Sequence, residues 1–143
     1  MLKIISIVSM LCIIIIAGPA WGLDLTPGKY EITTTTKMEI PNMPSGVPEM
    51  PPQTMTQCLT KQDPVPSSSA DAQGCKVTDM KTEGNTLTYT MTCEQQGQTI
   101  KSSGKMTYKG DTFNGTTKTN MESNNGKMTI TTLTNGKRIG KCD

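Results

Sequence analysis

From residue 87 to residue 134, apolar and polar side chains alternate with a period of two. Such alternation is typical of β-strands that bury one face and expose the other. Turn sequences interrupt it three times, at Gln96-Gly97, at Gly110-Asp111 and at Asn124-Asn125-Gly126. Because a short turn fixes which residues lie opposite each other, each turn also predicts a register between its two strands. The pattern therefore predicts an antiparallel meander.

The three predicted registers agree on a single buried face. The first turn places Leu87 opposite Met106, and the second places Tyr108 opposite Phe113. A slip of one residue would turn a whole strand inside out, so this agreement supports the assignment. The predicted inward residues are Leu87, Tyr89, Met91, Ile100, Met106, Tyr108, Phe113, Met121, Met128 and Ile130.

The middle of that inward face carries small or hydroxylated residues. They are Ser102, Gly104, Gly115, Thr117, Thr119 and Thr132. One interpretation is that the glycines mark bends in a coiled sheet and that another part of the chain fills the space. The other is a groove for an apolar or amphiphilic ligand. We expect such a ligand site to be bounded by Tyr89, Met106, Tyr108 and Phe113.

Further strands are expected on both sides of the meander. One runs from Tyr30 to about Ile40, and another precedes the meander at 76–81, where a bulge is predicted because simple pairing would turn Asp79 inward. Asn135-Gly136 predicts a turn into a last short strand. The fold class is therefore all-β, an antiparallel meander of about eight strands. It forms a small barrel or a strongly curved sheet, covered by the Pro/Met-rich loop at 41–52.

Residues 1–22 have the layout of a secretory signal peptide. An early lysine precedes an apolar run from Ile4 to Ala17, and small residues follow. Cleavage fits after Ala20 or after Gly22. We favour Gly22, which leaves 23–143 as a single exported domain, periplasmic or secreted. The alternative is an uncleaved membrane anchor, although the run is short for a bilayer span.

The cysteines predict a disulfide framework. Removal of the signal peptide takes away Cys12 and leaves Cys58, Cys75, Cys93 and Cys142, an even number in an oxidising compartment. Three pairings are possible. A three-residue turn in the hairpin before the meander would place Cys75 opposite Cys93, which leaves Cys58 for Cys142. A zinc site is the rival interpretation, but no Cys-x-x-Cys pair and no histidine occur.

The sequence excludes most catalytic mechanisms. Without histidine there is no Ser-His or Cys-His couple. Ser102 and Lys105 match a Ser-x-x-Lys motif, but their spacing places them on opposite faces of a strand. A formal net charge of +2 gives no indication of a nucleic-acid partner. We therefore expect a non-enzymatic protein without a cofactor: a binding or envelope-associated module for an apolar ligand or a partner segment.

Two other functions stay open. The chain has 11 methionines. Thioethers suit Cu(I), so Met43, Met50 and Met55 could form a soft-metal site or a methionine-oxidation buffer, while the other methionines fill the core. Alternatively, an exposed edge strand could add to the sheet of a partner protein.

Several short motifs occur in a fixed order along the mature chain. They are LTPGKYE at 25–31, QCLT at 57–60, GCKVTD at 74–79 followed by Cys93, and IGKC at 139–142. With the Met/Pro-rich loop, this order resembles a bacterial family of small exported proteins classed as a domain of unknown function. The resemblance implies a periplasmic or secreted β-protein over the whole mature chain, and it implies no catalytic residue.

Overall fold

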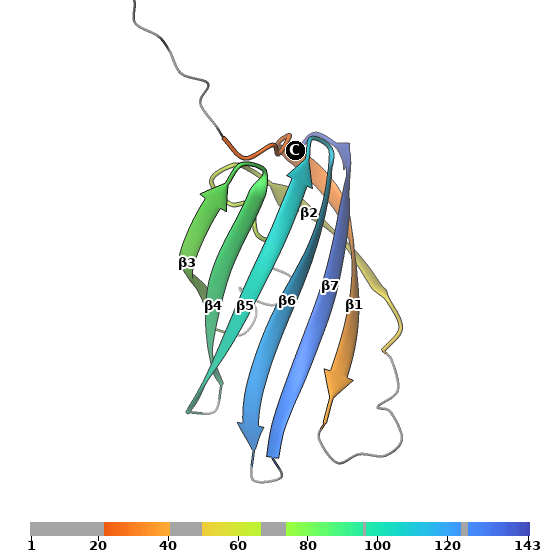
Figure 1. Cartoon of the computed structure of the whole chain (residues 1–143). Coiled ribbons are helices and arrows are strands. Elements are labelled where there is room, and N and C mark those ends of the chain that lie inside the picture. The colour runs from red at the N-terminus through yellow and green to blue at the C-terminus, as the bar shows by residue number, and fades with distance from the viewer. Residues whose placement is uncertain (1–21, 41–49, 67–73, 96, 124–125) are drawn as a thin grey trace, which may run out of the picture.

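The computed structural model describes residues 22–40, 50–66, 74–95, 97–123 and 126–143, and these contain strands and no helix. The strands form one antiparallel, seven-stranded sheet with the order β2-β1-β7-β6-β5-β4-β3 (Figure 1). The bounds are β1 (Gly28–Glu39), β2 (Gln53–Leu59), β3 (Cys75–Glu83), β4 (Thr86–Gln95), β5 (Gln98–Lys109), β6 (Thr112–Ser123) and β7 (Gly126–Gly140).

The sheet is strongly curved and does not close. Its front face in Figure 1 is convex, and β1 carries β2 around behind the strands of the meander. β2 and β3 remain as the two edges, with no ladder between them. The all-β, antiparallel prediction is confirmed, and of the two predicted forms the structure is the curved sheet.

The predicted registers are confirmed. Leu87 lies opposite Met106, and Tyr108 lies opposite Phe113. Across the third turn, Met121 lies opposite Met128. The turn residues 96 and 124–125 themselves lie outside the described residues. Of the predicted inward residues, Leu87, Tyr89, Met106, Tyr108 and Phe113 are buried, and Met91, Ile100, Met121, Met128 and Ile130 are half-buried.

The predicted turn at Asn135-Gly136 is wrong. β7 continues through it to Gly140, so the predicted last short strand is part of β7, while β2 is a strand for which the sequence analysis gave no bounds. The sheet has seven strands where about eight were predicted. Gly136 lies between Ile32 of β1 and Phe113 of β6, and the Phe113 ring lies where a Cβ on Gly136 would project. The glycine is needed for the close approach of an aromatic ring and not for a turn.

The predicted bulge in β3 is present. The register shifts between Val77 and Asp79, so that Asp79 lies opposite Thr90 and Met80 lies opposite Tyr89. The shift turns the Asp79 carboxylate to the convex face and puts Met80 on the concave face. The strand thereby avoids a buried carboxylate, which would be costly without a partner.

Two segments outside the strands complete the core. Leu23 and Leu25, just before β1, are buried, and Leu25 forms a bridge to Gly110 in the turn between β5 and β6. After β2 the chain crosses the concave face, where Val65 is buried and the Tyr108 hydroxyl donates to the carbonyl of Pro64 at 2.7 Å. Part of the predicted space is therefore filled by the chain itself. Residues 41–49 of the Pro/Met-rich loop lie outside the described residues.

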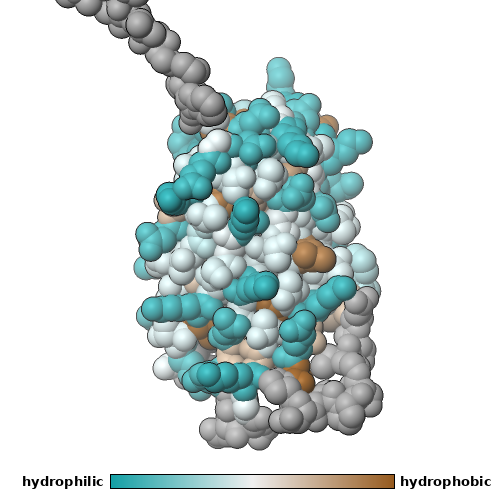
Figure 2. Space-filling model, viewed as in Figure 1, coloured by the Kyte–Doolittle hydropathy of each residue, from teal (hydrophilic) through white to brown (hydrophobic). Residues whose placement is uncertain are grey.

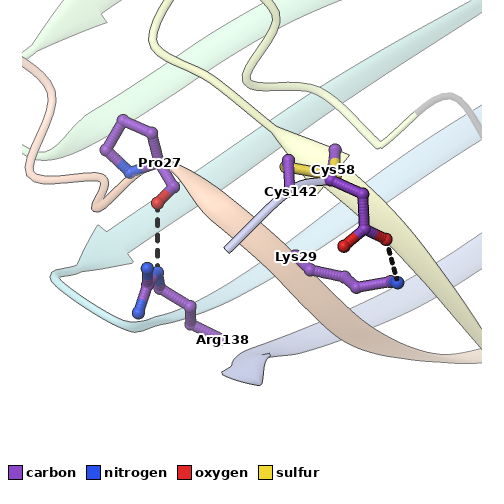
Figure 3. The surroundings of a disulfide bond; sticks show 6 residues. Pro27, Lys29, Cys58, Arg138 and Cys142 are labelled. Atoms are coloured by element: carbon purple, nitrogen blue, oxygen red, sulfur yellow. Dashed lines mark hydrogen bonds and ion pairs between the residues drawn. A yellow bond between two sulfur atoms is a disulfide. The ribbon is translucent and has the colours of Figure 1, made fainter. Parts of the chain in front are cut away.

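Both predicted disulfides are formed. Cys75–Cys93 joins directly opposite residues of β3 and β4. Cys58–Cys142 joins β2 to the segment after β7, so it crosses β1 between them (Figure 3). Beside it, Lys29 Nζ lies 3.4 Å from a carboxylate oxygen of Asp143. The bridge closes a loop that contains β3 to β7.

Candidate functional site

The concave face holds a small cavity in the middle of the sheet. Its volume is ≈ 100 Å³, and it is lined by Pro66, Tyr89, Met91, Met106, Thr117, Thr119, Thr132 and Thr134. A space of this size holds a few waters and is well below the volume of ordinary ligand pockets. A ligand on this face must therefore extend beyond the cavity along the half-buried part of the sheet.

The predicted ligand-site residues fall into two pairs. Tyr89 and Met106 line the cavity. Tyr108 and Phe113 are packed deeper in the core, where the Phe113 ring centroid lies 5.5 Å from that of Tyr108 and 5.6 Å from that of Tyr30. The aromatic end of the concave face is therefore solid core, and the accessible part begins at Tyr89.

Large side chains cover the small residues that the sequence places at the centre. The Tyr89 ring lies over Gly104, its cross-strand partner, and its hydroxyl lies 2.8 Å from Thr117 Oγ1. Met106 covers its own partner, Gly115, in the same way. Sequence analysis missed this filling, although the predicted register already paired each glycine with a bulky neighbour. The open space is consequently smaller than the residue sizes suggest.

Methionine occurs on the concave face of every strand, and sequence analysis missed this arrangement. Met106 is buried, Met80 is 53% exposed, and the other five are half-buried. Toward the far end of the sheet, Ile100 and Met121 border a further hollow of ≈ 310 Å³. The methionines in strand order are Met38, Met55, Met80, Met91, Met106, Met121 and Met128.

The structure describes two of the three predicted soft-metal residues, Met50 and Met55. Met55 lies on β2 and packs against the core, while Met50 is 39% exposed. Met43 lies outside the described residues. Among the residues that the structure does describe, no group of three His, Cys, Asp or Glu side chains could hold a metal ion.

The edge strand β3 carries features that oppose strand addition. Its bulge interrupts the regular ladder, and charged residues occur along its length, including Lys76, Asp79, Lys81 and Glu83. Bulges and edge charges are common means by which proteins prevent edge-to-edge pairing. Val77 and Met80 are nevertheless exposed there, at 37% and 53%.

All three tyrosines of the chain have raised pKa values. Burial is the main cause of the raised pKa of Tyr30, Tyr89 and Tyr108, and the negative charge of Asp111 contributes second at Tyr30. The Tyr108 hydroxyl also donates to Pro64 and is the most strongly affected. In the folded protein the three phenols therefore stay neutral above the pH at which they ionise in an unfolded chain.

This predicts cooperative unfolding at alkaline pH. A pKa raised by folding favours the folded state below the unfolded value, near pH 10, and that contribution is lost as the pH rises toward the folded values. Absorbance of the tyrosinate and far-ultraviolet circular dichroism should therefore change together in a pH titration. If all three phenols ionised near pH 10 while the β-sheet spectrum stayed intact, their raised pKa values would be contradicted.

Within the described parts of the chain there is no apolar helix of membrane-spanning length. The fold and the concave face define an all-β, disulfide-bonded domain built on one open, curved sheet. The chain belongs to the family described as protein of unknown function (DUF3617), whose model matches residues 25–142. No curated protein matches the chain, and no solved structure does. The family resemblance seen in the sequence is thereby confirmed, and it covers the sheet and both disulfides.

Proposed function

We propose that this protein is a non-enzymatic, exported binding module that holds an apolar or amphiphilic ligand against its concave face. The observation that carries the proposal is the placement of one methionine on this face by each of the seven strands. Five of them are half-buried and one is more than half exposed, so the apolar lining continues where the packed core ends.

Methionine suits a surface that adapts to its ligand. Its unbranched side chain and polarisable sulfur fill irregular gaps, and methionine-rich surfaces are typical of promiscuous apolar binding. The rigid end of the face is formed by Tyr108 and Phe113, while Tyr89 marks the start of the adaptable part. We assign the ligand contacts to Met91, Ile100, Met121, Met128 and Ile130, with Tyr89 and Met106 at the inner end of the site.

The disulfides support the exported location that this proposal includes. Two disulfides stabilise the fold, and disulfides persist in oxidising compartments such as the periplasm or the extracellular space. The predicted signal peptide lies outside the described residues except for Gly22. Leu23 and Leu25 belong to the core, so cleavage before Leu23 would leave both core leucines in the mature domain.

Titration with the neutral, environment-sensitive dye N-phenyl-1-naphthylamine tests the proposal. We expect saturable fluorescence enhancement with the oxidised mature domain. Met121→Lys should abolish it, because a charge would be introduced into the apolar lining, whereas Leu133→Lys on the convex face should bind as the unchanged protein does. Circular dichroism checks that both variants fold. Non-saturable fluorescence, or equal effects of the two variants, would contradict the proposal.

A further inference from the structure

The convex face carries a second feature, a groove with basic and hydroxyl side chains. Most of this face is hydrophilic or intermediate in hydropathy, with isolated hydrophobic residues (Figure 2). The groove has a volume of ≈ 570 Å³ and lies over β3, β4, β5 and β6. Its polar side chains project from the face opposite the concave site, and Met80, Tyr89 and Gly104 also border it.

The register places the lining of the groove in two rows across these strands. The first row runs from Asp79 through Thr90 and Ser103 to Lys118. Each residue is the direct cross-strand partner of the next, so neighbouring side chains start about 5 Å apart. The row has a carboxylate at one end, an ammonium group at the other and two hydroxyls between them.

The second row lies beside the first and adds two more ammonium groups. It runs from Lys81 through Thr88 and Lys105 to Thr116. Lys105 is a diagonal neighbour of Lys118, at a Cα separation of about 7 Å. The long side chains of these two lysines can therefore meet on a single anion.

The groups that face the groove are available for binding. Lys81 forms a salt bridge with Glu83 at 2.7 Å and is the main cause of the lowered pKa of that carboxyl, to which the charge of Lys105 also contributes. Within the described residues neither Lys105 nor Lys118 forms a salt bridge of its own. No side-chain hydrogen bond within that same part of the chain involves the hydroxyl of Ser103. Ammonium groups without a salt bridge, beside the free hydroxyl of Ser103, are suited to bind an oxyanion.

From these contacts we infer that the convex groove binds a phosphorylated polyol. Lys105 and Lys118 contact the phosphate. The hydroxyls of Ser103 and Thr116 form hydrogen bonds with the polyol hydroxyls, as donors or as acceptors. A phosphate ester fits better than free phosphate because threonine methyls and lysine stems also line the groove and contact carbon atoms. Asp79 sits at the far end of its row, away from Lys118, where it can accept hydrogen bonds from the polyol hydroxyls.

Calorimetric titration with glycerol phosphate at constant ionic strength tests the inference. Lys105→Gln/Lys118→Gln should weaken binding by about tenfold or more, as expected from the loss of two charge-assisted contacts. The matched control is Lys109→Gln/Lys137→Gln, which removes the same charge from the convex face outside the groove. The control should change affinity by less than about twofold, because long-range contributions are screened.

Two further titrations identify the source of the phosphate group. Vesicles of phosphatidylcholine with phosphatidylglycerol present the same group as a lipid headgroup, and inorganic phosphate presents it without the polyol. If the unchanged protein binds glycerol phosphate and Lys105→Gln/Lys118→Gln does not, the ligand is soluble. If the unchanged protein binds only the vesicles and that variant does not, the ligand is a lipid headgroup. Equal losses in both double variants, or no binding of either glycerol phosphate or vesicles, would overturn the inference. The dye titration is independent of all of these outcomes.

Discussion

Replacement of both Cys58 and Cys142 by serine should lower the free energy of unfolding by about 4.5 kcal/mol, which is the chain-entropy expectation for a loop of this length. The two cysteines are separated by 84 residues, and their bridge ties β2 to the end of the chain across β1. Without it, the edge strand β2 loses its covalent link to the segment that follows β7. A small β-domain without that link should be close to unfolding at room temperature.

The second disulfide is the control for this prediction. Cys75 and Cys93 are separated by only 18 residues, and the same reasoning gives about 3 kcal/mol for their removal. Urea denaturation of the two double-serine variants, each compared with the oxidised protein, measures the difference. An equal or larger loss on removal of the shorter bridge would show that local geometry, and not loop length, determines the contribution.

Gly136→Ala should destabilise the fold by about 3 kcal/mol, at the upper end of the overpacking range. An added Cβ would project into the Phe113 ring, and that ring is itself fixed between Tyr30 and Tyr108. Because Tyr108 is hydrogen-bonded to Pro64, displacement of the aromatic cluster would also disturb the segment that crosses the concave face.

Gly140→Ala is the matched control on the same strand. A Cβ at Gly140 meets nothing within 4 Å, so thermal and urea denaturation should show a change within about 0.5 kcal/mol. The paired variant Gly136→Ala/Phe113→Leu should recover part of the loss, since a smaller side chain makes room for the methyl group. Equal stabilities of the two alanine variants would contradict the assigned packing.

The fold was predictable from alternation and turns because the two signals are independent. A strand with one solvent-exposed face has alternating polar and apolar residues, and a short turn fixes the register between two strands. The pairing of Leu87 with Met106 and of Tyr108 with Phe113 could therefore be predicted without structural information. Asn135-Gly136 failed because glycine has two uses. It permits turns, and it also permits close packing against a backbone, and local sequence does not distinguish them.

The candidate site was less predictable than the fold. The concave side of β4 to β7 was assigned correctly, but the depth of the site depends on which segment fills it. Val65 and Pro64 come from a polar, proline-containing loop, and nothing in their local pattern marks them as core residues. The face of Met80 depends on the position of the bulge in β3, which the sequence does not give, and Met38 and Met55 lie on strands that have no tight turn to fix their register.

The position of β1 between β2 and β7 has a consequence for the order of events during synthesis. Thr35 of β1 pairs with Leu133 of β7, so the ladder that joins β1 and β2 to the meander can form only after the last strand has been synthesised. The hairpins of β3 to β6 are local and can assemble early, while the pairing of β1 depends on contacts distant in sequence and is slow to form. A nascent chain that lacks its carboxyl-terminal strand therefore cannot complete the sheet, because β1 and β2 have no partner strand in the meander.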